Sequence, residues 1–208
     1  MNEAAAGHKG NGRAAAQRER ILRAAQKCFV DRGFHAASMA TIAQTAEMSP
    51  GLIYRYFSSK SEIILAIIGQ QLDVARERIG ELHAASDLAG AMAGAYGTPG
   101  ECDSERISPP LFLEMSAEAT RDPQIAAAAQ TSDAAVRAAL MQVLVRRQEE
   151  GGYGVPKAEA AGRALMLMCL FEGLKVREAR EPKLDRKVLR AALEQVLTTI
   201  FQPSRRAS

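Results

Sequence analysis

Apolar residues recur at intervals of three and four along most of this chain, which is the period of an amphipathic helix. Residues 17–33 show the pattern clearly, with five apolar side chains on one face and Gly33 as a stop signal. No segment alternates polar and apolar residues for long enough to indicate a strand. The sequence therefore predicts an all-α fold.

Proline, glycine and N-capping residues divide the chain into a series of expected helices. Residues 1–14 lack periodicity, and we expect them to form a mobile arm that carries Lys9 and Arg13. Serine caps helix N-termini and proline fits the first helical position, so Ser38 and the pair Ser49-Pro50 indicate helix starts. The expected helices span residues 17–33, 39–46, 50–57, 60–80, 86–95, 111–120, 123–150, 156–178 and 183–201.

The composition is that of a soluble globular protein, with 47% hydrophobic and 25% charged residues. The N-terminus lacks the apolar segment of a secretion signal, and the chain has no apolar run of about 18 residues that could cross a membrane. The cysteines Cys28, Cys102 and Cys169 are odd in number and widely spaced, which is typical of reduced thiols. We expect a cytoplasmic protein that does not span a membrane.

Positive charge is concentrated at the N-terminal end. Residues 1–60 contain nine Lys or Arg and four Asp or Glu, whereas residues 61–208 contain 18 and 20. A basic end joined to a neutral body is typical of proteins that bind a polyanion, although a bias of this size also arises by chance.

Three short helices are expected close together near the N-terminus, with a three-residue turn between the second and the third. This is the layout of a helix-turn-helix, whose third helix enters the DNA major groove. Ile53 and Phe57 lie four residues apart and can fix the third helix to the core. The residues left on or near its outward side are Gly51, Leu52, Tyr54 and Arg55.

The hydroxyls of Tyr54 and Tyr56 and the ammonium of Lys60 are groups that suit phosphate oxygens. Lys60 also stands at the start of the next helix, where free N–H groups favour an anion. The pattern alone also allows these aromatics to be core residues of a small helical domain, and it allows Arg55 to be a solvated charge.

The run SMATIAQTAEMSPGLIYRYFSSKSEII resembles the signature of the tetracycline-repressor (TetR) family, in which a Gly-x-x-Tyr-x-(His/Tyr)-Phe helix is followed by a lysine. Gly51, Tyr54, Tyr56, Phe57 and Lys60 match, and the resemblance covers residues 15 to about 75. The family usually has glycine in the turn where this chain has Glu47. A non-glycine residue in left-handed backbone costs on the order of 1 kcal/mol, so we expect a slightly altered turn.

The resemblance implies a helix-turn-helix domain at residues 15–75, with its motif at 38–57, and a helical ligand-binding and dimerisation domain at residues 76–208. It implies a transcriptional regulator of the repressor type that binds a palindromic double-stranded DNA operator. The residues expected to contact DNA are Ser38, Thr41, Ser49, Pro50, Gly51, Leu52, Tyr54, Arg55, Tyr56 and Lys60.

A homodimer is expected because one recognition helix binds DNA weakly, and two copies about 34–36 Å apart read a palindrome. The segment 165–171 is apolar on every side of its helix, and the last helix carries two neighbouring apolar stripes. The resemblance implies a four-helix bundle between subunits, and the alternative is that both helices are core helices of a monomer. The residues expected at the dimer contact are Leu165, Met168, Leu189, Leu193, Val196 and Ile200.

The middle helices would enclose a pocket for a small apolar or amphipathic effector, as the resemblance implies. Its candidate lining residues are Phe112, Met115, Met141, Met166 and Phe171, although methionine at helical spacing is often plain core. Binding of the effector would tilt the helix that begins at Lys60 and release the operator. Coupling of about 1–3 kcal/mol would lower DNA affinity roughly 5- to 150-fold.

We expect no enzyme, cofactor or metal site. No nucleophile–base constellation, phosphate loop or paired-carboxylate motif is present, and the three histidines lack metal-ligand spacing. Glu114 and Glu118 are interpreted as a solvated or intersubunit face, with a polar ligand contact as the minor alternative. Two other functions stay open: a transcriptional activator of the same family, and an all-α binding protein or enzyme without operator recognition.

Overall fold

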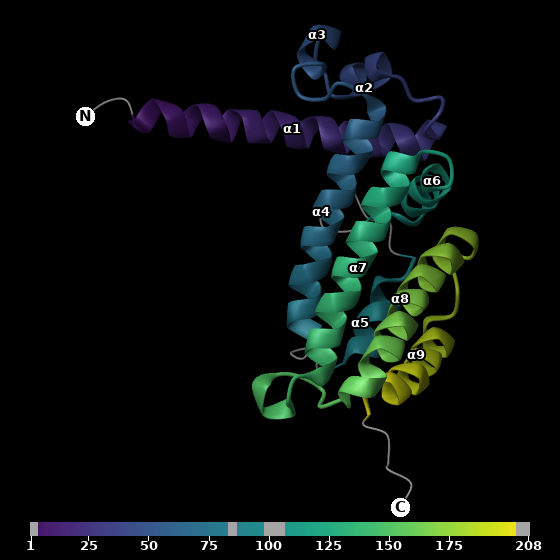
Figure 1. Cartoon of the computed structure of the whole chain (residues 1–208). Coiled ribbons are helices and arrows are strands. Elements are labelled where there is room, and N and C mark those ends of the chain that lie inside the picture. The colour runs from purple at the N-terminus through teal and green to yellow at the C-terminus, as the bar shows by residue number, and fades with distance from the viewer. Residues whose placement is uncertain (1–3, 83–86, 98–106, 203–208) are drawn as a thin grey trace, which may run out of the picture. The chain divides into compact units, whose positions relative to one another are not determined.

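The computed structural model describes residues 4–82, 87–97 and 107–202, with side chains described from residue 12 onward (Figure 1). The described residues contain helices and no strand, so the predicted all-α fold is confirmed. The α-helices are α1 (Ala4–Arg32), α2 (Met39–Thr45), α3 (Pro50–Ile53), α4 (Lys60–Glu81), α5 (Leu88–Ala95), α6 (Pro109–Ala119), α7 (Pro123–Val145), α8 (Lys157–Arg180) and α9 (Arg186–Phe201).

Several helix limits differ from the sequence-based expectation: α3 ends at Ile53 instead of residue 57, α6 begins at Pro109 instead of residue 111, and α9 begins at Arg186 instead of residue 183. Helix α1 already begins at Ala4, so the prediction of an irregular arm over residues 1–14 is wrong for the described part of that segment. Alanines supply the helix propensity there, which outweighs the glycines. Helix α7 ends at Val145 instead of residue 150, and a short 3-10 helix (Gln148–Glu150) leads to Gly151, whose φ is 78°.

The chain divides into two compact units. Unit 1 comprises residues 1–70 and 102–128, and unit 2 comprises residues 71–101 and 129–208. Helix α6 therefore belongs to the same unit as the N-terminal helices. The predicted functional boundary near residue 75 stays a prediction, because a compact unit and a functional domain need not share their limits.

Unit 1 is organised around the apolar faces of α1, α2 and the first half of α4. Phe29, Ile42, Phe57 and Ile67 are among its fully buried side chains, and Leu111 of α6 joins the same core. Complete burial of such a side chain contributes roughly 1.5–3 kcal/mol. This core holds the short helices α2 and α3, which are too short to be stable in isolation.

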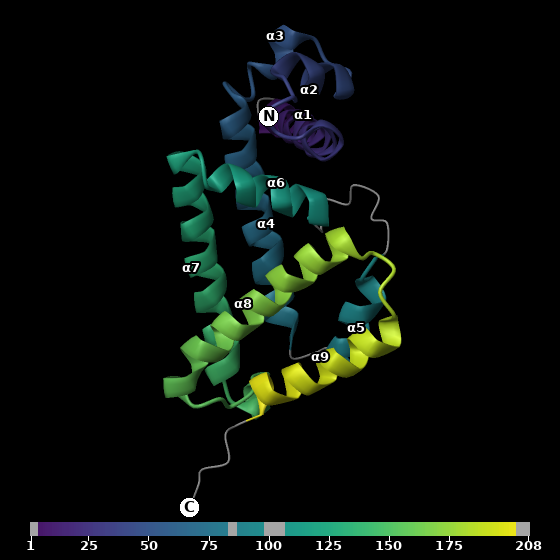
Figure 2. The same cartoon turned by 90° about the vertical axis from the view of Figure 1, so that its right-hand side faces the viewer.

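Unit 2 is built mainly from α5, most of α7, α8 and α9, and α9 packs against α5 and α8 (Figure 2). One side of α9 is buried through Leu189, Leu193, Leu197 and Ile200. The buried Arg163 of α8 donates to the carbonyls of Ile200 and Gln202 at the C-terminal end of α9, where carbonyls lack intrahelical donors. Arg163 thereby fixes the end of α9.

Candidate nucleic-acid interface

Helix α2 starts at a side-chain cap that involves two of the predicted DNA contacts. The hydroxyl of Ser38 accepts a hydrogen bond from the Thr41 N–H at 3.0 Å, and the two hydroxyl oxygens lie 2.8 Å apart. Ser38 is exposed and Thr41 is half-buried. The pair therefore sets the position of the first turn of α2 and keeps hydroxyl groups at the surface of unit 1.

The turn between α2 and α3 keeps the left-handed residue that the family usually fills with glycine. Glu47 has a φ of 51°, and the N–H groups of Glu47 and Met48 donate to the carbonyls of Gln44 and Ala43 at 2.9 Å each. This pair of bonds is the Schellman ending of a helix. The expectation of an altered turn is wrong, because Glu47 itself adopts the conformation.

Arg20 of α1 supports the strained residue. Its Nη2 atom lies 2.9 Å from Glu47 Oε2 and 3.5 Å from the Glu47 carbonyl oxygen. Both side chains are largely exposed, so the ion pair contributes at most about 1 kcal/mol. This is of the same order as the cost of the left-handed backbone.

The free energy of unfolding should separate these two effects. Glu47→Ala removes the ion pair and keeps the strain, whereas Glu47→Gly removes both. We therefore expect Glu47→Gly to be more stable than Glu47→Ala by about 1 kcal/mol. Urea titrations of both variants measure the difference, and equal stabilities would show that the left-handed position carries no strain.

Helix α3 begins the segment that the sequence predicts to enter the DNA groove, called the recognition segment below. Pro50 occupies its first turn, and Ser49 caps the backbone without a side-chain bond. Ile53 and Phe57 are completely buried, as the sequence predicted, and the backbone continues beyond Ile53 in helical turns through Phe57. The opposite side of this segment is therefore held rigidly at the surface.

The outward residues of this segment are those predicted from the sequence. Gly51, Tyr54 and Arg55 are exposed, with Tyr54 at 57%, and Leu52 is half-buried. A Cβ atom added at Gly51 would meet nothing within 4 Å. Tyr56 is partly buried against the core of unit 1, so less of its ring is available than of Tyr54.

Sequence reasoning missed two arginines of α1 that lie beside the motif. The Arg18 guanidinium stacks 4.3 Å from the ring centroid of Phe57, and Arg20 pairs with Glu47 as described above. Both residues were part of a charged helix face, for which solvation is the ordinary interpretation. Their partners lie far away in the sequence, so the local pattern could not indicate these contacts.

The side chain of Lys60 forms hydrogen bonds within the protein. Its ammonium donates to the carbonyls of Phe34 at 2.8 Å and His35 at 3.3 Å, and it lies 4.6 Å from the Phe34 ring centroid. These carbonyls follow the end of α1, where carbonyl groups need donors. Lys60 therefore fixes the segment between α1 and α2, and its predicted contact with phosphate stays a prediction.

The start of α4 is held by a second set of bonds. The N–H and hydroxyl of Ser58 donate to Glu62 at 2.6 and 2.8 Å, and the Ser59 hydroxyl accepts from the Glu62 N–H at 3.1 Å. The bond from the Ser58 N–H is the main reason why the pKa of Glu62 lies below its ordinary value. The helix following the recognition segment thus has a fixed beginning.

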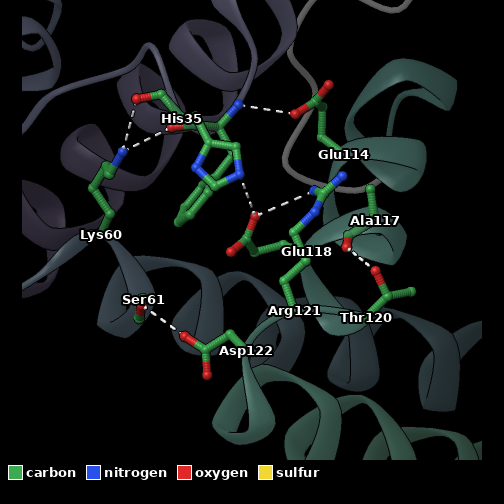
Figure 3. A network of polar contacts seen from close by, with 10 residues as sticks. His35, Lys60, Ser61, Glu114, Ala117, Glu118, Thr120, Arg121 and Asp122 are labelled. Atoms are coloured by element: carbon green, nitrogen blue, oxygen red, sulfur yellow. Dashed lines mark hydrogen bonds and ion pairs between the residues drawn. The ribbon is translucent and has the colours of Figure 1, made fainter.

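Three acidic residues at four-residue spacing connect α6 and the start of α7 to the DNA-binding segment (Figure 3). Glu114 accepts the Phe34 N–H at 2.9 Å, Glu118 lies 3.5 Å from His35, and Asp122 accepts the Ser61 hydroxyl at 3.1 Å. The interpretation of Glu114 and Glu118 as a solvated or intersubunit face is therefore wrong. They contact the loop after α1 within unit 1.

The predicted dimer residues fall into two groups. Leu189, Leu193 and Ile200 are buried in the core of unit 2, and Met168 packs against that core, so they offer little surface to a partner. Leu165 and Val196 are 51% and 42% exposed. Both sides of α9 are apolar, so the sequence does not show which side is buried within the subunit. The prediction therefore placed the buried residues at the dimer contact.

Four large apolar side chains of α8 and α9 are exposed. They are Leu165 and Met166 of α8 and Val188 and Val196 of α9, whose exposed fractions range from 42% to 62%. Helices α8 and α9 lie against each other in unit 2 (Figure 2). The structure therefore leaves an apolar surface on these two helices, which we call the α8–α9 face.

The five predicted ligand residues are divided between the two units. Phe112 and Met115 belong to unit 1, where Met115 packs against the core. Met141 is partly buried in unit 2, whereas Met166 and Phe171 are 56% and 38% exposed. Their role in binding an effector stays a prediction.

Unit 2 also contains two carboxyl groups whose pKa lies above the ordinary value. Desolvation raises the pKa of Asp133 on α7, and desolvation together with the charge of Asp133 raises the pKa of Glu172 on α8. Arg137 acts in the opposite direction on Asp133. Among the described residues, no group of His, Cys, Asp and Glu side chains is arranged to hold a metal ion.

No described helix is long and apolar enough to cross a membrane. Residues 21–67 match the family model for bacterial regulatory proteins of the tetR family, and residues 104–202 match the BetI-type transcriptional repressor C-terminal model. The chain is 31% identical over 161 residues to the HTH-type transcriptional regulator UidR of Escherichia coli strain K12, covering 76% of this chain and 79% of that protein. The protein belongs to the TetR family of transcriptional regulators.

Two further comparisons agree. The structure of Salmonella enterica GusR superposes with a TM-score of 0.66 and 27% identity, covering 89% of this chain and 95% of that one. The HTH-type transcriptional activator FasR of Mycolicibacterium smegmatis is 46% identical over 57 residues, which are 27% of this chain and 26% of that protein. The chain is thus a DNA-binding transcriptional regulator and not an enzyme.

Proposed function

We propose that the protein is a homodimeric repressor that binds a palindromic operator and is released from it by a small apolar or amphipathic molecule. Residues 15–75 would bind DNA, and residues 76–208 would dimerise and bind the effector. The C-terminal match to a repressor model favours repression.

The main support for the DNA interface is that the segment after Ser49 has one buried face and one exposed face. Ile53 and Phe57 are fully buried, while Gly51, Tyr54 and Arg55 remain exposed. A rigid helix start with little side-chain bulk can approach a groove closely. Tyr54 and the hydroxyls of α2 suit phosphate oxygens, and Arg55 and Leu52 suit base edges.

The α8–α9 face supports the dimer. Its four apolar residues, Leu165, Met166, Val188 and Val196, lie on two adjacent helices of one unit. Several large exposed apolar side chains on adjacent helices favour an interaction site, and a second copy brings the same face to it. Two helices from each subunit would then form a four-helix contact, and paired recognition helices would match a palindrome.

The effector site is proposed for the helical body outside the recognition segment. Phe112, Met115 and Met141 remain candidates because each is only partly buried, and methionine adapts to ligands of different shape. Met166 belongs to the α8–α9 face, so we assign it to the proposed dimer contact and not to the effector site. Phe171 remains a weaker candidate because it is exposed on α8.

Selection of duplexes from a random pool by the purified protein tests the proposal. The expected product is a palindrome with half-sites about 34–36 Å apart, bound with an affinity that falls steeply as salt rises. The expected stoichiometry is one dimer or two dimers on each duplex. Enrichment of no sequence would refute operator recognition.

Activation is the second candidate, because the segment most similar to FasR comes from an activator. Both modes use the same DNA contacts. A reporter placed behind the selected operator separates them: deletion of the regulator gene should raise expression from a repressed promoter and lower it from an activated one.

A further inference from the structure

Arg18 lies where helix α1 enters the core of unit 1. Residues 12–16 of α1 are exposed, and the first buried residue of the helix is Ile21. Arg18 therefore stands one turn outside the packed part of α1, and its side chain is exposed. Its guanidinium carbon nevertheless has a defined position, 4.3 Å from the ring centroid of Phe57.

The contact with Phe57 leaves the polar edge of the guanidinium available. An arginine that stacks on a ring uses the face of its planar group, whereas its N–H groups point outward in that plane. Arg18 donates no hydrogen bond and forms no ion pair within 4.0 Å among the described residues. Three other basic residues of α1, Arg20, Arg23 and Lys27, each pair with a carboxylate.

Phe57 places this guanidinium beside the recognition segment. Phe57 is completely buried and ends the helical turns that begin at Pro50, and Tyr54, three residues earlier, is 57% exposed. Helices α2 and α3 lie on one side of α1 in both views (Figures 1 and 2). The contact with Phe57 therefore brings the side chain of Arg18 next to the segment that would enter a groove, and phosphates line the edges of every groove.

One carboxylate attracts Arg18 but already has other donors. Glu62 at the start of α4 accepts the N–H and the hydroxyl of Ser58. The backbone bond from Ser58 is the main reason why the pKa of Glu62 lies below its ordinary value, and the charge of Arg18 is the smallest of the causes. Glu62 therefore helps to hold Arg18 over the ring without occupying its N–H groups.

We propose that Arg18 is a phosphate-binding residue of the DNA interface, held over Phe57 so that its outer N–H groups bind one backbone phosphate beside the recognition segment. The inference rests on the proposed DNA interface. The planar fork of arginine matches two oxygens of a phosphate, and a stacked side chain loses less freedom when it binds. Such a contact positions the recognition segment and carries no sequence information of its own.

The salt dependence of DNA binding tests the contact. Arg18→Met removes the charge and keeps a flexible side chain that can pack on the ring. A duplex of random sequence is the probe, because phosphate contacts do not depend on sequence. The slope of log affinity against log salt should become shallower by about 0.9 for each lost contact, or about 1.8 for a dimer.

Two further variants serve as controls for this slope. Arg18→Lys keeps the charge but lacks the planar fork, so it should retain most of the slope and bind more weakly than the wild type. Arg147→Met removes the same charge from an exposed arginine of unit 2 and should leave the slope unchanged.

The operator selected by the wild-type protein gives a second measurement. Arg18→Met should lower affinity for it about five- to thirtyfold, which corresponds to one exposed ion pair in each subunit. Uncharged methylphosphonate groups placed at successive backbone positions then locate the phosphate. At one position in each half-site, the replacement should weaken binding by the wild type but not by Arg18→Met.

The alternative role of Arg18 is to shield the ring of Phe57 from water. A lower melting temperature of Arg18→Met with an unchanged salt slope would establish that role and overturn the phosphate contact. Methylphosphonate effects that are equal in both proteins at every position would overturn it as well. If the protein selected no operator, the proposed operator recognition would fail, and the salt slope on the random duplex would still decide the role of Arg18.

Discussion

Leu165→Glu is expected to convert the protein into monomers and to lower operator affinity on the order of a hundredfold or more. Leu165 is 51% exposed on the α8–α9 face, and in a two-fold dimer each substitution places two carboxylates in the same contact. Burial of unpaired charge is strongly unfavourable. Light scattering should report a mass near 22.4 kDa for the variant and about twice that mass for the wild type.

Two matched variants show whether the effect belongs to this face. Val145→Glu introduces the same charge at an apolar residue that is 37% exposed at the end of α7, and it should leave the dimer intact. Leu193→Glu places the charge in the core of unit 2, so it should lower the melting temperature sharply instead of dissociating a folded dimer. A dimeric Leu165→Glu protein would refute the assignment of the face.

Gly51→Ala is expected to weaken operator binding about ten- to a hundredfold while leaving the fold at least as stable as before. A Cβ atom at this exposed helical position meets nothing inside the protein, and alanine is a better helix former by up to about 1 kcal/mol. The loss of affinity would therefore arise only because the added methyl group keeps the helix from approaching the DNA closely. Fluorescence anisotropy and thermal unfolding measure the two effects separately.

Gly69→Ala is the control for this experiment. Gly69 is also exposed and helical, its added Cβ also meets nothing within 4 Å, and it lies in α4 away from the recognition segment. It should gain stability without a change in affinity. If both alanine variants bound the operator as the wild type does, the backbone at Gly51 would not approach DNA closely.

The elements of the fold were predictable because their limits depend on local chemistry. Ser38, Ser49-Pro50 and Gly33 mark helix limits by capping, by fixed φ and by positive φ, and each stands where the structure begins or ends a helix. The N-terminal arm was not predictable in the same way. Its glycines and alanines favour opposite outcomes, and no apolar period decides between them.

The recognition segment was predictable for the same local reason, since a four-residue spacing places Ile53 and Phe57 on one side of a helix turn. Which apolar side of α9 is buried within the subunit was not. Helix α9 has apolar residues on two sides, and only packing shows that Leu189 and Leu193 face the core while Val188 and Val196 face outward. Sequence period identifies a stripe but not what covers it.

The contacts of α6 depend on segments that lie far apart in the chain. Glu114 reaches Phe34 across 80 positions, and nothing in either local sequence indicates the partner. The contacts of Lys60 within the protein were missed for a related reason. An exposed ammonium beside a DNA-binding motif suits phosphate, but two carbonyls at the end of α1 are nearer at hand.

The left-handed turn at Glu47 has an evolutionary consequence. Glycine would adopt the left-handed conformation of this turn without strain, whereas Glu47 is strained there and forms an ion pair with Arg20 of a different helix. A change at Arg20 alone therefore leaves the strained residue without its partner, and a return to glycine at position 47 frees Arg20 to vary. The two positions should accordingly change together among close relatives that carry glutamate, and position 20 should drift where glycine occupies the turn.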